Sequence, residues 1–211
     1  TDFSKLTIDK LELQGTTFSY NSMTRLRIKM LGENQVRNAA VAIDTIKALH
    51  KKGYLIPEEA IRNGLYHAKW NGRFEIVGTQ PLFLIDGAHN EDAAIALAKN
   101  IELYFSNKRI LYIMGILADK DYEAILRHTG SYADSIITIT PDNSRALPAE
   151  KLASAAEKYC SKVVSTGKVS DAIQKAYEDA EKEDIIIAFG SLSYLKEIYD
   201  YFGITGTFYY A

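Results

Sequence analysis

The sequence predicts an α/β fold, a Rossmann-like and mostly parallel sheet with helices on both faces, preceded by the tail of another domain. From about Leu82 onward, one unit recurs: an apolar run, a polar turn and an amphipathic helix. Runs such as Ile185–Ala188 are apolar throughout, which is typical of strands that are buried on both faces. The first 70 residues lack this alternation.

The first part of the chain is predicted to form strands followed by helices. The expected elements are two strands at Lys10–Tyr20 and Arg25–Met30 and two helices at Asn34–Lys51 and Pro57–Tyr66. Two strands alone are marginal in water, so we expect residues 1–70 to end a domain that begins upstream. Trp70, Asn71 and Gly72 interrupt the helical pattern, which places the second domain at residues 71–211.

The second part predicts five strands, each followed by a helix. The strands are expected at Leu82–Ile85, Arg109–Met114, Ser135–Thr140, Lys162–Ser165 and Asp184–Phe189. Asn90 can cap the first helix, and Glu91 and Asp92 favour its positive end. Later helices are expected to begin near Pro148 and at Ser170–Asp171, because proline is tolerated in a first turn and serine caps helices.

Composition excludes several classes of protein. The net charge of −2 and pI near 6.1 give no general attraction for nucleic acid or acidic membranes. A single cysteine cannot form an internal disulfide, which suits the cytoplasm. No apolar run approaches the roughly 18 to 20 residues of a membrane span, and the first residues do not form a signal peptide. We therefore expect a soluble cytoplasmic protein.

A ligand site is predicted where the strand at Leu82–Ile85 ends. The chain continues through the carboxylate of Asp86 and a glycine turn to His89, at the start of the next helix. Ligands gather at the carboxyl ends of strands in open α/β sheets, and helix N-termini there offer N–H groups to anions. From the residues alone, Asp86 is explained equally well as a turn residue, and His89 is better explained as a residue that caps or packs at a helix start.

Two stretches, Gly72–Glu75 and Ile85–Asn90, closely resemble the folylpolyglutamate synthase/dihydrofolate synthase family, within the Mur-type ATP-dependent amide ligases. The resemblance implies that Arg73 and Asp86 bind ATP and that His89 binds the incoming glutamate. It extends to Gly190–Leu192, where it implies a glutamate-binding role for Ser191. A helix N-cap explains that serine without a ligand.

Weaker parts of the resemblance add further candidates. Leu31–Gln35 with Asn38–Ala40 resembles a family stretch in which Asn38 would lie near adenine, although Asn34 stands where histidine is common. Gly115–Asp121 and Ser144–Leu147 also resemble family segments, which makes Asp119, Lys120 and Asp121 possible site residues. Helix capping plus a surface ion pair explains these three equally well, and an exposed polar position explains Asn38.

The chain has no phosphate-binding Gly-x-x-x-x-Gly-Lys-Ser/Thr loop, so the resemblance covers only the carboxyl-terminal half of the family's architecture. It implies the tail of the central ATPase domain at 1–70 and a glutamate-ligase domain at 71–211. ATP would activate folate or dihydropteroate as an acyl phosphate, which L-glutamate attacks. Mg²⁺ ligands are expected in the missing N-terminal ATPase region, and no metal ligand or catalytic residue is expected here.

Two other functions fit the same sequence. Another Mur-type ligase would use this chemistry to add an amino acid to a cell-wall precursor. A binding module that retains the domain without catalysis is the other alternative.

Overall fold

The computed structural model describes residues 1–205. The chain divides into two compact units, Thr1–Trp70 and Asn71–Ala211, and each is described by itself. Within the described part, no helix combines the length and the apolar character needed to cross a membrane.

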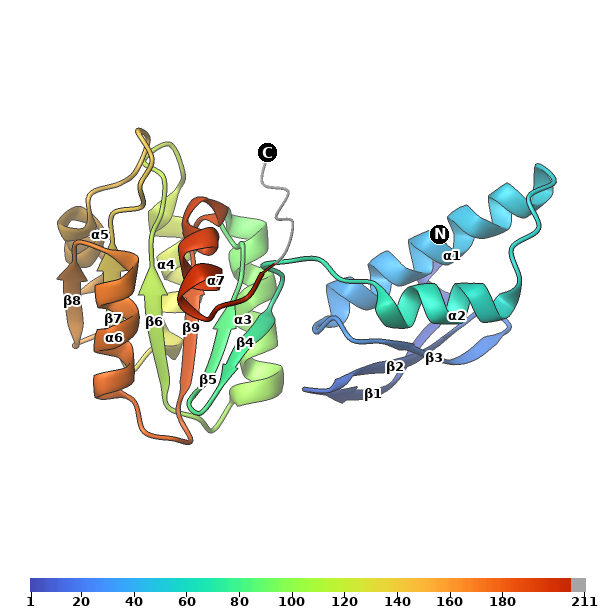
Figure 1. The fold of residues 1–211 in the computed structure, drawn as a ribbon, viewed down its shortest axis with the longest axis horizontal. Helices are drawn as coiled ribbons and strands as arrows, with labels where there is room; N and C mark the ends of the chain where they lie inside the picture. Colours follow the sequence, from blue (N-terminus) through green and yellow to red (C-terminus); the bar gives the residue numbers. More distant parts are fainter. Residues whose placement is uncertain (206–211) are drawn as a thin grey trace. The chain divides into compact units, whose positions relative to one another are not determined.

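The first unit is a three-stranded antiparallel sheet covered by two helices (Figure 1). A short 3-10 turn, Phe3–Lys5, precedes strands β1 (Leu6–Glu12), β2 (Gly15–Tyr20) and β3 (Met23–Ile28), and helices α1 (Glu33–Lys51) and α2 (Glu58–His67) follow. Apolar residues of β2, β3 and both helices form one core. Its members include Phe18, Leu26, Ile28, Val36, Ile43, Ile61 and Leu65.

The prediction of two strands in this unit was wrong, whereas both helices are confirmed to within one residue at each end. The segment predicted as one strand contains a tight turn before Gly15, which has a φ of +128°. A Cβ at Gly15 would lie 2.4 Å from the carbonyl oxygen of Ile28, so only glycine fits there. The alternation of apolar residues continues through this turn, so the periodic pattern alone did not indicate that the strand is interrupted there.

The second unit contains a six-stranded sheet in the order β4-β5-β9-β6-β7-β8. The strands are β4 (Glu75–Thr79), β5 (Leu82–Ile85), β6 (Ile110–Met114), β7 (Ser135–Ile139), β8 (Val163–Thr166) and β9 (Ile185–Phe189). All pairs are parallel except β4 with β5. The fold class and the five predicted strands are confirmed, while the antiparallel edge strand β4 was not predicted.

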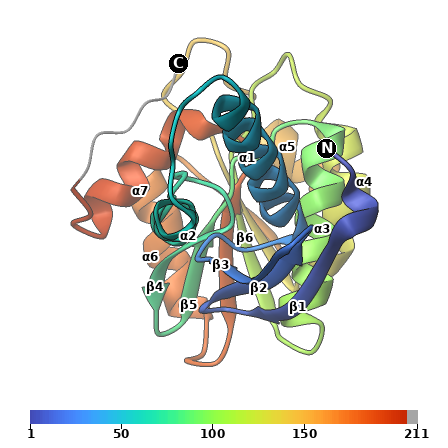
Figure 2. The same cartoon turned by 90° about the vertical axis from the view of Figure 1, so that its right-hand side faces the viewer.

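Helices cover both faces of this sheet, as expected (Figure 2). Helices α6 (Val169–Asp179) and α7 (Leu195–Tyr201), with the 3-10 turn η3 (Leu192–Tyr194), pack on one face. Helices α3 (Glu91–Phe105), α4 (Tyr122–Thr129) and α5 (Ala149–Ala156) lie on the other, and a 3-10 turn, Gly130–Tyr132, follows α4. Successive side chains of β6 point to opposite faces. Ile113 packs with α6 and α7, whereas the hydroxyl of Tyr112 donates a hydrogen bond to the end of α4.

The strand order positions the candidate site. Strand β9 lies between β5 and β6, so the carboxyl ends of these three parallel strands are neighbours. The chain leaves β5 and β6 toward α3 and α4 on one face, and it leaves β9 toward α7 on the other. Such a divergence opens a crevice at the carboxyl edge of an α/β sheet, where ligands bind.

Candidate functional site

Three loops meet at this carboxyl edge. They are Asp86–Asn90 after β5, Gly190–Ser191 after β9 and Gly115–Asp121 after β6. The backbone N–H of Asp86 donates to Ala188 O at 2.9 Å, and that of Gly115 donates to Phe189 O at 3.3 Å. The sheet ladder therefore continues into the loops and holds them side by side.

Asp86 is buried at the centre of the edge, with 9% of its surface exposed. Its Oδ2 accepts the N–H of Phe74 and its Oδ1 that of Ala88, both at 2.8 Å. Burial raises the pKa of this carboxyl to about 6, against the opposing effect of the two N–H donors and of Arg73 and His89. Each oxygen keeps a lone pair with which a hydroxyl could bond.

Arg73 lies in a turn that packs against this loop. Its Nη1 lies 3.3 Å from the position that a Cβ on Gly87 would occupy, so the guanidinium crosses the glycine turn. Across the part of the chain that the structure describes, the Arg73 side chain has no hydrogen-bond or ion-pair partner. A half-buried guanidinium with its donors unused is well suited to an anionic ligand.

His89 has a defined tautomer. Its Nδ1 lies 2.7 Å from the carbonyl oxygen of Gly87, and since a carbonyl only accepts, Nδ1 carries the proton. The neutral ring therefore leaves Nε2 as an acceptor, which becomes a donor when the ring is protonated. A carboxylate ligand would pair with the protonated form.

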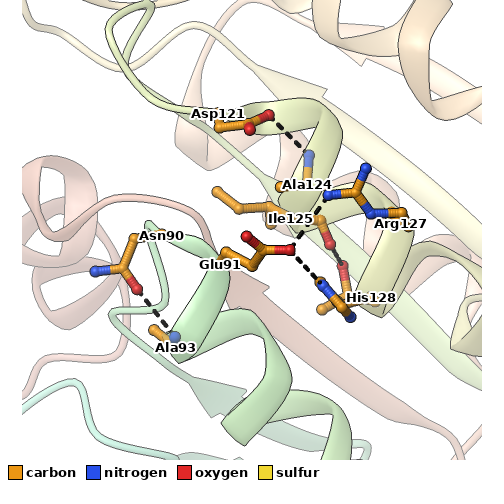
Figure 3. A network of polar contacts seen from close by, with 9 residues as sticks. Asn90, Glu91, Ala93, Asp121, Ala124, Ile125, Arg127 and His128 are labelled. Carbon is orange, nitrogen blue, oxygen red and sulfur yellow. Dashed lines mark hydrogen bonds and ion pairs between the residues drawn. The ribbon is translucent and has the colours of Figure 1, made fainter.

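The start of α3 is anchored immediately beyond His89 (Figure 3). The Asn90 side chain accepts the N–H of Ala93 at 2.9 Å, which confirms the predicted cap. Glu91 Oε1 lies 2.9 Å from His128 Nε2 and 3.2 Å from Arg127 Nη2 on α4. Hydrogen bonds from His128 and then Arg127 lower the pKa of Glu91, so this exposed anchor stays ionised.

Ser191 reaches the same edge, but its hydroxyl is engaged. Only 4% of the residue is exposed, and its Oγ accepts the N–H of Ser193 at 3.1 Å as the cap of η3. The neighbouring Leu192 has a methyl group 2.5 Å from the position of a Cβ on Gly87. The loops after β5 and β9 are therefore in contact, and the capping role expected as the alternative for Ser191 is present.

We predict that Gly190→Ala destabilises the second unit by about 2 kcal/mol, through backbone strain and a clash. Gly190 has a φ of +115°, and its Cβ would lie 2.6 Å from the carbonyl oxygen of Gly115. Gly167→Ala is the matched control, because nothing lies within 4 Å of that Cβ. Chemical denaturation of both variants checks this, and equal midpoints would contradict it.

The possible site residues after β6 have structural partners. Asp121 caps α4 by accepting the N–H of Ala124 at 2.9 Å (Figure 3). Asp119 Oδ2 lies 3.6 Å from Lys120 Nζ and 3.5 Å from Arg145 Nη1. The Ser144–Leu147 segment lies alongside, through a bridge between Leu117 and Ala146. The capping and the ion pair are thus observed, and a role in ligand binding stays a prediction.

Two sequence predictions remain, the adenine-binding role of Asn38 in the first unit and the absence of metal ligands. Asn38 lies on an exposed face of α1, where its amide donates to Gln35 Oε1 at 3.2 Å, and its adenine role stays a prediction. Across residues 1–205, no three His, Cys, Asp or Glu side chains are grouped to hold a metal ion.

Glu75, at the start of β4, is a further polar residue at this edge for which the sequence predicted no role. Glu75 accepts the N–H of Gly72 at 2.7 Å and the hydroxyl of Tyr199 at 2.6 Å. Tyr199 lies 124 positions further along the chain, so no local pattern could have indicated this contact.

Comparisons with known proteins place this geometry among ligases. The family model described as "Mur ligase, glutamate ligase domain" matches residues 72–192. A probable bifunctional folylpolyglutamate synthase/dihydropteroate synthase of Haloferax volcanii is 34% identical over 174 residues, covering 82% of this chain and 20% of that protein. The dihydrofolate synthase/folylpolyglutamate synthase of Bacillus subtilis is 31% identical over 189 residues, covering 87% of this chain and 44% of that protein.

A solved structure agrees with these sequence matches. The structure "E.coli FolC in complex with DHPP and ADP" superposes with a TM-score of 0.76 and 28% identity, covering 93% of this chain and 45% of that one. The chain therefore spans less than half the length of each of these relatives.

Proposed function

The chain belongs to the Mur ligase family, whose glutamate ligase domain it contains, and we propose that it forms the carboxyl-terminal part of an ATP-dependent ligase that adds L-glutamate to folate. The sequence resemblance to folylpolyglutamate synthases agrees with the names of its relatives. The E. coli relative bound to ADP supports the nucleotide. The cytoplasm is the proposed compartment.

The observation that carries this proposal is the gathering of Arg73, Asp86 and His89 around one loop at the carboxyl end of β5. The unused donors of Arg73 suit phosphate oxygens, and a lone pair of Asp86 suits a ribose hydroxyl. His89 and the N–H groups at the start of α3 suit the carboxylate of glutamate. Asn38 is proposed to lie near adenine, and Ser191 near glutamate.

The proposed reaction has two steps. A carboxylate oxygen of folate, or of dihydropteroate, attacks the γ-phosphorus of ATP, which gives an acyl phosphate and ADP. The amine of glutamate then attacks the acyl carbon, so that an amide bond forms, phosphate leaves and the amine loses a proton. Binding both reactants at one edge contributes to the rate by orienting them. Mg²⁺ would neutralise the negative charge of the phosphates. The residues that hold it are expected outside the described residues.

We predict no glutamate-dependent release of ADP by this chain alone, because its sequence contains no phosphate-binding loop. The measurement is a coupled ADP assay with folate and glutamate. The positive control is the full-length protein that carries this chain joined to an ATPase half. Turnover by residues 1–211 alone at a rate close to that of the control would contradict the prediction.

The same assay separates folate from a cell-wall substrate. With the full-length protein, folate or dihydropteroate should support ADP release, whereas a cell-wall nucleotide precursor should not. Release with the cell-wall precursor only would identify another Mur-type ligase. Release with neither, together with no ATP binding, would favour a non-catalytic module.

A further inference from the structure

We infer that Glu75, through its contact with Tyr199, is a positioning residue that holds the Arg73 turn in the conformation that meets nucleotide. This inference rests on the proposed function, since it assigns a role in presenting Arg73 to ATP. Glu75 itself faces the turn and α7, so it acts through Arg73 and not on the ligand.

The Arg73 turn has a strained backbone. Gly72 and Phe74, which flank Arg73, have φ values of +69° and +46°. Phenylalanine rarely adopts the left-handed region, so this conformation persists only where the surroundings impose it. Strain of this kind is often found where a side chain must be presented to a ligand.

Contacts from several elements impose the conformation. Asp86 accepts the N–H of Phe74 at 2.8 Å, and Gly72 O accepts the N–H of Gly87 at 2.7 Å. The ring of Phe74 is buried and packs on Tyr104 and Phe105 of α3, with ring centroids 5.8 Å and 6.0 Å away. These contacts hold the carbonyl of Gly72 and the backbone and ring of Phe74 against the β5 loop and α3.

The N–H of Gly72, on the other side of the turn, depends on Glu75. Its Oε2 accepts the N–H of Gly72 at 2.7 Å and the phenol of the fully buried Tyr199 at 2.6 Å. The carboxylate therefore links the backbone just before Arg73 to helix α7, whose Leu195 would lie 2.4 Å from a Cβ on Gly72. Without this acceptor, Gly72 keeps only the bond from its carbonyl to Gly87, so the turn is held less firmly on its α7 side and Arg73 loses its defined direction.

The test compares variants of the full-length protein by the separate KM values for ATP and glutamate. Glu75→Ala removes both bonds and should raise the KM for ATP about tenfold, with kcat and the KM for glutamate within about twofold of wild type. Glu75→Gln keeps an oxygen that can accept from Gly72 and Tyr199, so its KM for ATP should stay within about threefold.

Tyr199→Phe provides a second route to the same answer if Glu75→Ala does not fold. It removes only the hydroxyl that donates to Glu75, so the KM for ATP should rise about threefold. Tyr112→Phe is the matched control, because Tyr112 is also buried and donates to a backbone carbonyl, that of Thr129, at 3.1 Å. The control should leave the KM for ATP unchanged.

Three results would overturn the positioning role. They are an unchanged KM for ATP in both Glu75→Ala and Tyr199→Phe, equal increases in the KM values for ATP and glutamate, and a failure of Glu75→Gln to restore ATP affinity. A wild-type protein that adds no glutamate would instead refute the proposed function, so the two failures are distinguishable.

Discussion

Arg73→Ala in the full-length protein is expected to raise the KM for ATP about 100-fold, equivalent to about 2.7 kcal/mol. A charged hydrogen bond is worth about 1.5 to 3 kcal/mol, and a guanidinium can make two such bonds to a phosphate. No described residue forms a hydrogen bond or ion pair with the Arg73 side chain, so its removal should cost folding stability little beyond its attraction to the Asp86 carboxylate. Arg73→Lys keeps the charge but not the planar fork, and should recover part of the affinity.

Lys108→Ala is the control for this prediction. Lys108 is also a cation of the second unit, but it is exposed, it precedes β6 and so lies at the amino edge of the sheet, and it forms an ion pair with Glu183. Its removal should leave the KM for ATP unchanged. An Arg73→Ala variant with wild-type affinity for ATP would contradict the nucleotide role.

The second large effect concerns Asp86 and pH. Burial raises its pKa from 3.8 to about 6, so the folded protein holds this proton more tightly than the unfolded chain does. The stabilising contribution of Asp86 is therefore complete below pH 3.8 and is lost as the pH rises through about 6. This shift corresponds to about 3 kcal/mol, because each pKa unit is worth about 1.36 kcal/mol.

Asp86→Asn isolates this contribution, since asparagine does not titrate. The free energy of unfolding of wild type minus that of the variant should fall by about 2.4 kcal/mol between pH 4 and pH 8, because part of the contribution is already lost at pH 4. Urea denaturation of residues 1–211 at several pH values measures this difference. A difference that stays constant, or that grows with pH, would contradict the raised pKa and its cause, burial.

The strands of the second unit were predictable because their burial leaves a strong local signal. β6 and β9 are buried at every position, which produces continuous apolar runs bounded by polar turns. β4 gives no such signal, because it is a partly exposed edge strand that contains Gly78. The turn before Gly15 was hidden because alternation continues on both sides of it.

The candidate site was predictable in its membership but not in its internal bonds. The motif placed Arg73, Asp86 and His89 near one strand end, and the structure brings them together there. The left-handed conformation of Phe74 was not predictable, because it results from tertiary contacts and opposes the residue's own preference. The Glu75 to Tyr199 bond likewise joins segments that are far apart in the chain.

The most direct test is a crystal structure of the full-length protein with a non-hydrolysable ATP analogue and L-glutamate. We expect the guanidinium of Arg73 within hydrogen-bond distance of a phosphate oxygen, Asp86 on a ribose hydroxyl, and His89 on a carboxylate of glutamate. Both ligands bound with no contact to Arg73, Asp86 or His89 would contradict the account.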